Sequence, residues 1–228
     1  MLLYETVLRN TVANRGDDMA NRTPGITEKL TEQAMQEFLT NGYTNASLRT
    51  IAENAGTSPR AVYTRYGDKE GLFSALVAEQ AETLKAMFRR YMSDYHERPV
   101  DEQKQLFHDE HYQTEYRGYI QTSIDYIYDN LDVFRLLICG SEGTKYASFV
   151  DEIVEIEEHY TLLYIEHTGS DVISSGRAKP QLVHLLCSSF VHGFFEFVRH
   201  DMPKDEAFTY IYQLQDFFAC GWDHLFSP

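Results

Sequence analysis

Side chains that can bind anions and nucleobases gather between Gly56 and Lys69. This segment holds three basic residues, Arg60, Arg65 and Lys69, against a single acid. Guanidinium and ammonium groups bind phosphate, and a guanidinium can also pair with the edge of a base. The segment therefore predicts contact with nucleic acid, provided that the surrounding chain holds these side chains on one surface.

Two short helices joined by a glycine turn are expected to hold them there. Four apolar residues recur at helical spacing before Gly56, which ends the first helix: Leu48, Ile51, Ala52 and Ala55. A second helix begins at Pro59 with Ser58 as its N-cap. In a helix-turn-helix unit the start of the second helix lies in the major groove. We therefore expect Arg60 to contact a base.

The neighbouring residues are better placed for the DNA backbone. We expect Tyr63, Arg65 and Tyr66 to contact phosphates or sugars. Lys69, with the amides that open the next helix behind Asp68, is expected to form a further anion site.

The region of about 26–76 resembles the N-terminal domain of the TetR family of transcriptional regulators. The matching residues are Gly42, Tyr43, Ser47, Leu48, Arg49, Ile51, Ala52, Ala55, Gly56, Ser58, Tyr63, Tyr66, Lys69, Leu72 and Phe73. Two positions depart from the family pattern. Ala46 replaces a usual threonine, and Thr50 replaces a usual acid, which weakens the capping box at this helix start.

The resemblance implies an all-α fold, with an N-terminal three-helix helix-turn-helix domain followed by a helical ligand-binding and dimerisation domain. It implies a homodimer that binds a palindromic DNA operator and is released by a small-molecule effector. The residues predicted to contact DNA are Ser47, Arg49, Thr57, Ser58, Pro59, Arg60, Tyr63, Thr64, Arg65, Tyr66 and Lys69.

Length and charge fit this division. Of 228 residues, 1–23 are expected to form a flexible arm, 24–76 the DNA-binding domain and 77–228 the effector-binding and dimerisation domain. The net charge is −15, yet residues 1–70 hold 8 basic and 9 acidic residues, whereas the remainder holds 12 and 26. The acidic body repels a duplex, so DNA contact should be confined to the small cationic tip.

The remaining chain has helical patterns near 69–95, 103–129, 131–139, 146–168, 179–200 and 204–226. The last two helices are apolar on more than one face, so one face is expected to pack on a second subunit. The predicted interface residues are Phe194, Phe218 and Trp222. In the acidic stretch 151–160, Ile153, Ile156 and Tyr160 are expected to face inward and the acids to be solvated.

Sixteen tyrosines and fourteen phenylalanines are a high aromatic load. Such side chains can line a cavity for a mostly apolar, aromatic or cationic effector. The residues predicted to bind it are Tyr112, Tyr116, Tyr119, Tyr126, Phe134, Phe149 and Tyr160. A filled aromatic core is the alternative.

Other function classes have less support. Motifs typical of hydrolases, nucleotide-binding proteins and metalloproteases are missing from the sequence, so neither an enzyme nor a cofactor is expected. No apolar run approaches the ~20 residues of a membrane span, and three cysteines without a CxxC pair suit a cytoplasmic protein. No metal site is predicted, although His108 and His111 leave open a metal-responsive regulator, the cysteines a redox-responsive one, and the helices an interaction module without DNA contact.

Overall fold

The computed structural model describes residues 25–105 and 110–227, and within these ranges the regular elements are all helices. The predicted arm, 1–23, lies outside the described residues. The helices are α2 (Ile26–Asn45), α3 (Leu48–Asn54), α4 (Pro59–Tyr66), α5 (Lys69–His96), α6 (Val100–Gln103), α7 (Glu110–Asp129), α8 (Leu131–Cys139), α9 (Phe149–Thr168), α10 (Pro180–Phe194), α11 (Glu196–Arg199) and α12 (Lys204–Phe226). The all-α prediction is confirmed for the described residues.

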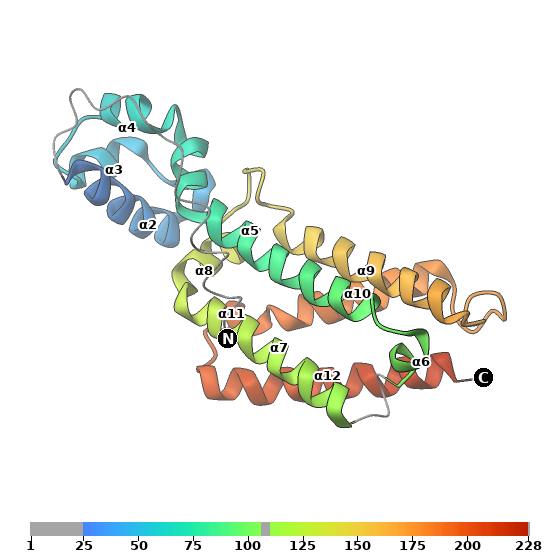
Figure 1. Ribbon diagram of the computed structural model, residues 1–228. Helices are drawn as coiled ribbons and strands as arrows, with labels where there is room; N and C mark the ends of the chain where they lie inside the picture. The colour runs from blue at the N-terminus through green and yellow to red at the C-terminus, as the bar shows by residue number, and fades with distance from the viewer. Residues whose placement is uncertain (1–24, 106–109, 228) are drawn as a thin grey trace.

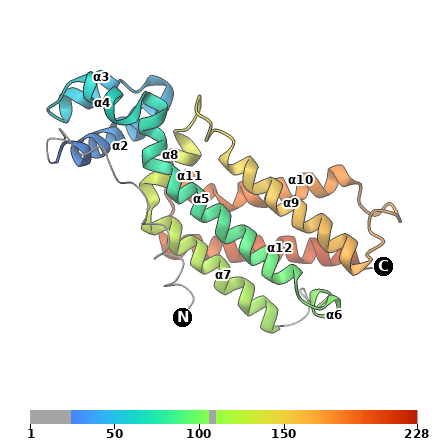
Figure 2. The same ribbon diagram turned by 45° about the horizontal axis from the view of Figure 1, so that its top comes forward.

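A small N-terminal unit of α2, α3 and α4 lies at one end of an elongated helical body (Figure 1). Helix α5 starts in the small unit and runs into the body, as the tilted view in Figure 2 also shows. It packs on α2 and α4 near its start, and on α7, α8 and α9 further along. Asp68 begins α5 as its N-cap, and its Oδ1 accepts a hydrogen bond of 2.7 Å from the Gly71 amide. A single stiff element therefore joins the two parts.

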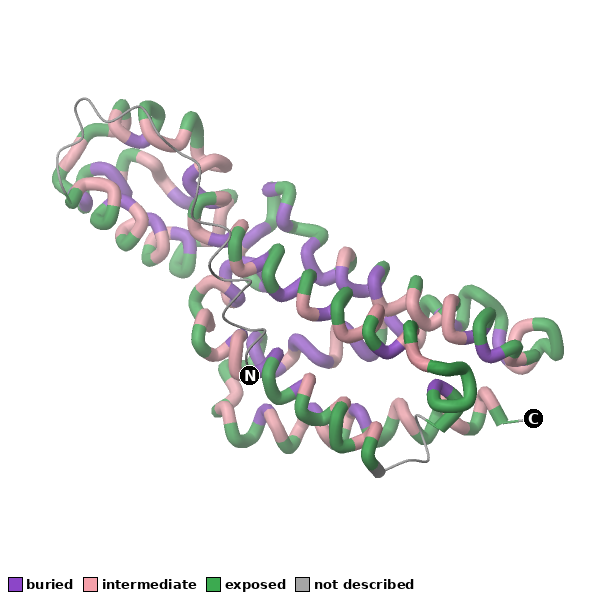
Figure 3. The backbone as a smooth tube through the Cα atoms, in the orientation of Figure 1, coloured by how far each residue is buried: buried purple, intermediate pink, exposed green. Residues whose placement is uncertain are grey.

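The buried apolar residues form a continuous core from α2 to α12 (Figure 3). Phe73 on α5 lies at the junction, where its ring packs on Phe38 of α2 at 5.2 Å and on Tyr146 at 6.0 Å between centroids. The domain boundary expected after residue 76 falls inside α5. The two proposed domains are therefore distinguished by function and are joined by one continuous helix.

Helix ends follow the glycines and prolines that the sequence offers. Gly42 has φ 67°, which interrupts α2, and one further turn follows. The helix expected over 179–200 is divided at Phe195 into α10 and α11, whereas α12 covers the predicted 204–226. The helix expected from 103 is preceded by the short α6, and α7 is described from Glu110.

The expectation that no apolar run approaches the length of a membrane span was wrong. Among the described residues, Pro180–Arg199 is long and apolar enough to cross a membrane by length and composition. The same stretch packs on α9 and α12 and contains core residues such as Val191 and Phe195. It is therefore a core helix of the body rather than evidence for a membrane span.

Candidate functional site

The start of α3 is held by a contact that the sequence pattern did not predict. Ser47 is its N-cap, and the Oγ atom accepts a 3.2 Å hydrogen bond from the Thr50 amide. The Ser47 amide donates to Glu37 Oε1 of α2 at 2.9 Å. In a capping box an acid three residues into the helix accepts a hydrogen bond from this amide. Glu37 supplies that acceptor from another helix, which compensates for Thr50.

The turn between α3 and α4 is tight. Gly56 has φ 70°, and the Thr57 amide donates to the Ala52 carbonyl at 2.8 Å. Ser58 occupies the N-cap position of α4 with extended backbone, and Pro59 is the first helical residue. The Ser58 side chain makes no capping hydrogen bond, contrary to the prediction, so it stays exposed at the tip.

Helix α4 presents three exposed side chains, Arg60, Tyr63 and Thr64, and buries Val62 on its opposite face. Tyr63 is 55% exposed, so its ring is available for contact. The Thr64 hydroxyl donates to the Arg60 carbonyl at 2.8 Å. These side chains lie at the outer end of the small unit, in the place that a recognition helix needs.

Three other predicted DNA contacts are engaged within the unit. Arg65 is half-buried, and Tyr66 packs against the core. Lys69 Nζ donates to the Thr44 carbonyl at 3.1 Å and lies 4.8 Å from the centre of the Tyr43 ring. Burial lowers the pKa of Lys69.

The anion site expected at the start of α5 is not formed. The Lys69 ammonium is bound to Thr44, and the Gly71 amide is already capped by Asp68. We therefore no longer assign Lys69 to a phosphate.

The remaining predicted contacts lie at the two helix starts. Arg49 is exposed and forms an ion pair with Glu53 at 2.7 Å, one helical turn away. Ser47, Thr57 and Pro59 are half-buried. Their backbone positions border the tip, but their side chains contribute less surface than α4.

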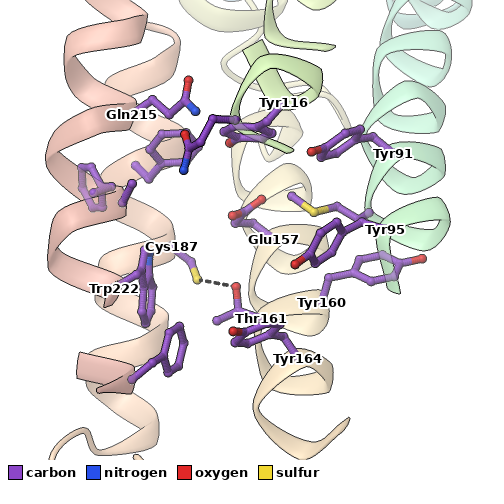
Figure 4. A pocket seen from close by; sticks show the side chains of 16 residues that line it. Tyr91, Tyr95, Tyr116, Glu157, Tyr160, Thr161, Tyr164, Cys187, Gln215 and Trp222 are labelled. Carbon is purple, nitrogen blue, oxygen red and sulfur yellow. Dashed lines mark hydrogen bonds between the residues drawn. The ribbon is translucent and has the colours of Figure 1, made fainter. Parts of the chain in front are cut away.

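A cavity of about 140 Å³ lies in the body among α5, α7, α9, α10 and α12 (Figure 4). Its walls are mostly aromatic. The lining residues are Tyr91, Met92, Tyr95, Gln113, Tyr116, Glu157, Tyr160, Thr161, Tyr164, Cys187, Phe190, Gln215, Phe218, Ala219, Trp222 and Phe226. An apolar hollow with a few polar groups is the usual form of a small-molecule site.

Only part of the predicted effector set lines this cavity. Tyr116 and Tyr160 do. Tyr119 stacks on the lining residue Tyr91 with 4.1 Å between ring centroids, so it supports the wall from behind. The Arg98 guanidinium lies 5.1 Å from the centre of the Tyr112 ring, and Tyr112 does not line the cavity.

The predictions for Phe134, Phe149 and Tyr126 were wrong. Phe134 and Phe149 are 0% and 1% exposed and pack in the core, and Tyr126 packs on Phe134 at 5.8 Å. These residues belong to the junction end of the body. Composition showed that aromatic residues were abundant, but only helix packing decides which of them face a hollow.

The residues predicted for the dimer interface make contacts within the chain. Phe194 is buried in the chain's own core at 3% exposure, so it cannot reach a partner in this conformation. Phe218 packs on Phe190 at 5.3 Å and Trp222 stacks on Phe226 at 5.4 Å between ring centroids. All four of these rings line the cavity.

Other apolar side chains are exposed on the same two helices. Phe217 on α12 is 74% exposed and Leu185 on α10 is 59% exposed. Where α10 and α12 meet, a Cβ added to Gly193 would lie 3.1 Å from Leu214 Cδ2, so the glycine permits their close approach.

Sequence reasoning missed Glu157, whose carboxylate points into the cavity between α5 and α12 (Figure 4). Its Oε2 atom is shielded from solvent and has no hydrogen-bond partner among the described residues. Desolvation raises the pKa of Glu157 from 4.5 to about 7. The expectation that all acids of this stretch are solvated was wrong. The helical spacing could have predicted the inward position of Glu157, because this residue is four residues after Ile153 and three before Tyr160, on the same face of the helix.

No group of three or more His, Cys, Asp or Glu side chains within 25–105 and 110–227 could hold a metal ion. His108, named above as a metal candidate, lies outside those ranges.

Comparison with known proteins agrees with this geometry. Residues 30–76 match the family described as bacterial regulatory proteins, tetR family. A transcriptional repressor of the helix-turn-helix type, AcnR of Corynebacterium glutamicum, is 39% identical over 54 residues, which are 24% of this chain and 29% of the repressor. The resemblance noted in the sequence is confirmed over this segment.

Solved structures show a similar fold over most of the chain. The TetR family transcriptional regulator PfmR from Thermus thermophilus is 16% identical with a TM-score of 0.51, covering 86% of this chain and 96% of PfmR. The fatty acid degradation regulator FadR from Bacillus halodurans is 14% identical with a TM-score of 0.51, covering 85% and 97%. At this identity the likeness is one of fold.

Proposed function

We propose that this chain, whose N-terminal domain belongs to the TetR family of bacterial regulatory proteins, is a transcriptional repressor that binds a palindromic operator as a homodimer and is released by a small molecule. The observation that carries the proposal is the exposed face of α4. Arg60, Tyr63 and Thr64 lie there without an apolar partner, at the tip of a unit whose sequence matches the family. Family and fold both favour a regulator over an enzyme.

Dimerisation is proposed through α10 and α12. Phe217 and Leu185 are the largest exposures of apolar side chains on these helices. A two-fold axis would bury these side chains and place two copies of α4 on one side of the DNA. Half-sites are then expected about one helical turn apart, or a multiple of it.

The effector is proposed to bind in the cavity and act through the junction. The loop between α8 and α9 contacts the small unit: the Gly140 carbonyl accepts from the Tyr43 amide at 2.9 Å, and the Glu142 carbonyl accepts from the Thr44 hydroxyl at 2.9 Å. A shift of the body helices would therefore move α2 and, with it, α4.

An ion pair also links α5 to α9. Lys85 of α5 is buried and its Nζ lies 2.6 Å from Glu152 of α9 and 2.6 Å from Glu82. Because α5 and α9 both line the cavity, a ligand between them can change the position of α5 relative to the junction. A ligand releases DNA only if it binds the DNA-incompetent arrangement more tightly.

The test is selection of genomic DNA fragments by the purified full-length protein, followed by titration of a selected site and of its scrambled version at two salt concentrations. We expect a palindromic consensus, preference for it over the scrambled site, and weaker binding at higher salt. Equal affinity for both sequences would overturn the proposal. The selected sites would also identify the neighbouring genes.

A further inference from the structure

The cavity contains an acid that no described residue neutralises. Among the described residues, burial is the sole cause of the raised pKa of Glu157, so no nearby cation offsets it. Two basic residues of the body are engaged with other acids: Arg98 pairs with Glu115, and Lys85 pairs with Glu82 and Glu152. Placing an ionised carboxylate in an apolar hollow costs free energy unless a cation accompanies it.

The walls around this acid also suit positive charge. Tyr91, Tyr95 and Tyr116 lie around Glu157 in Figure 4, and the Trp222 ring lies across the cavity. Aromatic faces carry negative electrostatic potential and attract quaternary ammonium and similar cations. A second acceptor is available because Gln215 Oε1 is shielded and without a hydrogen-bond partner in the described structure.

We propose that the effector is a lipophilic organic cation, with its positive centre held by the Glu157 carboxylate and by the tyrosine faces of the cavity. This rests on the proposed function of the cavity as the effector site. The proposal disfavours long-chain carboxylates as ligands, because an ionised Glu157 would repel their negative charge.

Charge can be tested separately from shape with two matched probes. Phenyltrimethylammonium and tert-butylbenzene have nearly the same shape and differ in charge, and 3-phenylpropanoate supplies the anion. Trp222 is the single tryptophan of the chain and lines the cavity, so its fluorescence reports binding.

We expect the wild-type protein to bind phenyltrimethylammonium about 10-fold or more tightly than tert-butylbenzene, and 3-phenylpropanoate most weakly. Glu157→Gln should lower affinity for the cation by about 10- to 100-fold, the effect typical of removing one partner from a charged contact, and leave the neutral probe unchanged. Glu155→Gln is the matched control, because Glu155 is exposed on the same helix. Thermal unfolding of both variants checks that they fold.

The pH dependence provides a second readout, because a quaternary ammonium does not titrate. Its affinity should rise between about pH 6 and pH 8 as Glu157 ionises, and stay flat in Glu157→Gln. Desolvation raises the pKa of the other facing groups above their ordinary values, so they stay neutral in this range: Tyr91 and Tyr95 on α5, Tyr116 and Tyr119 on α7, and Cys187 on α10.

Three further residues lie near the cavity acid. On α12 the facing residues Gln215 and Trp222 do not titrate. His96 contacts the lining residue Tyr160, and burial lowers its pKa below the ordinary 6.5, so its titration shifts toward pH values below the tested range.

The outcomes separate the two proposals. Equal affinity for cation and neutral probe, preference for the anion, no binding of the cation, or a cation preference that survives Glu157→Gln would each overturn the cation proposal. Operator release is measured independently. If phenyltrimethylammonium binds in a Glu157-dependent way but leaves operator affinity unchanged, the cation site stands and the effector function fails.

Discussion

The tip proposed to contact DNA and the cavity are built in opposite ways. Every residue proposed to contact DNA lies within the consecutive segment 47–69, whereas the cavity takes its walls from five helices between residues 91 and 226. The tip is a product of local spacing, since two short helices and one turn determine which side chains face outward. The cavity is a product of long-range packing. The two parts of this chain therefore differ in how much of their structure a sequence pattern reveals.

The strongest test of the comparison is whether the body controls the tip at a distance. We expect Phe217→Asp to convert the dimer to monomer in sedimentation and to weaken operator binding at least about 100-fold, because two linked half-sites would become independent. Leu162→Asp on α9, a residue 37% exposed, is the control and should leave both properties unchanged. A Phe217→Asp protein that remains dimeric would place the interface elsewhere.

The next test concerns how burial of the Glu157 carboxylate in the cavity lowers the free energy of unfolding. The folded-state pKa of Glu157 is raised from 4.5 to about 7, so the native state retains a proton that the unfolded state releases. The contribution of Glu157 to the free energy of unfolding is therefore most favourable below about pH 4.5. It decreases as the pH rises from there through about 7, by roughly 3 kcal/mol at most.

Urea unfolding at several pH values, at one protein concentration, would measure this loss. Glu157→Gln should remove it, and the exposed Glu155→Gln should retain it. An identical pH slope in wild type and Glu157→Gln would show that the carboxylate is solvated or already paired.

At the tip, one side chain should carry base preference. We expect Arg60→Ala to weaken operator binding by about 1–3 kcal/mol and to relax selectivity at one base step. Arg89→Ala removes the same charge from an exposed position on α5 and should leave sequence preference intact. If both variants lose affinity alike and keep the same consensus, Arg60 contacts the backbone only.

The smallest expected effect lies at the start of α3. Glu37→Ala removes the acceptor of the Ser47 amide, and we expect a loss of about 1 kcal/mol in unfolding free energy, similar to loss of a helix cap. Glu32→Ala on the exposed side of α2 is the control. Equal melting temperatures for the two variants would mean that water replaces Glu37 without cost.

The sequence by itself determined the helical fold, the ends of most helices and the exposed face of α4. Gly42, Gly56 and the Ser58-Pro59 pair act within one turn of the chain, and Val62 and Arg60 point to opposite sides of α4 because their spacing requires it. Such features depend on neighbours along the chain, which a pattern contains. The same reasoning placed α12 at 204–226.

Only the tertiary structure decided the rest, because it depends on which helix lies next to which. Phe134 and Phe149 became core while Tyr116 and Tyr160 line the cavity, although all four are aromatic residues on apolar faces. The Lys69 ammonium donates a hydrogen bond to the Thr44 carbonyl, 25 residues away in the sequence. The Ser47 amide donates to Glu37 on another helix. Glu157 is the clearest case: its spacing placed it on an inward stripe, but only the packing of α5, α7, α10 and α12 around α9 left its Oε2 atom without a hydrogen-bond partner among the described residues.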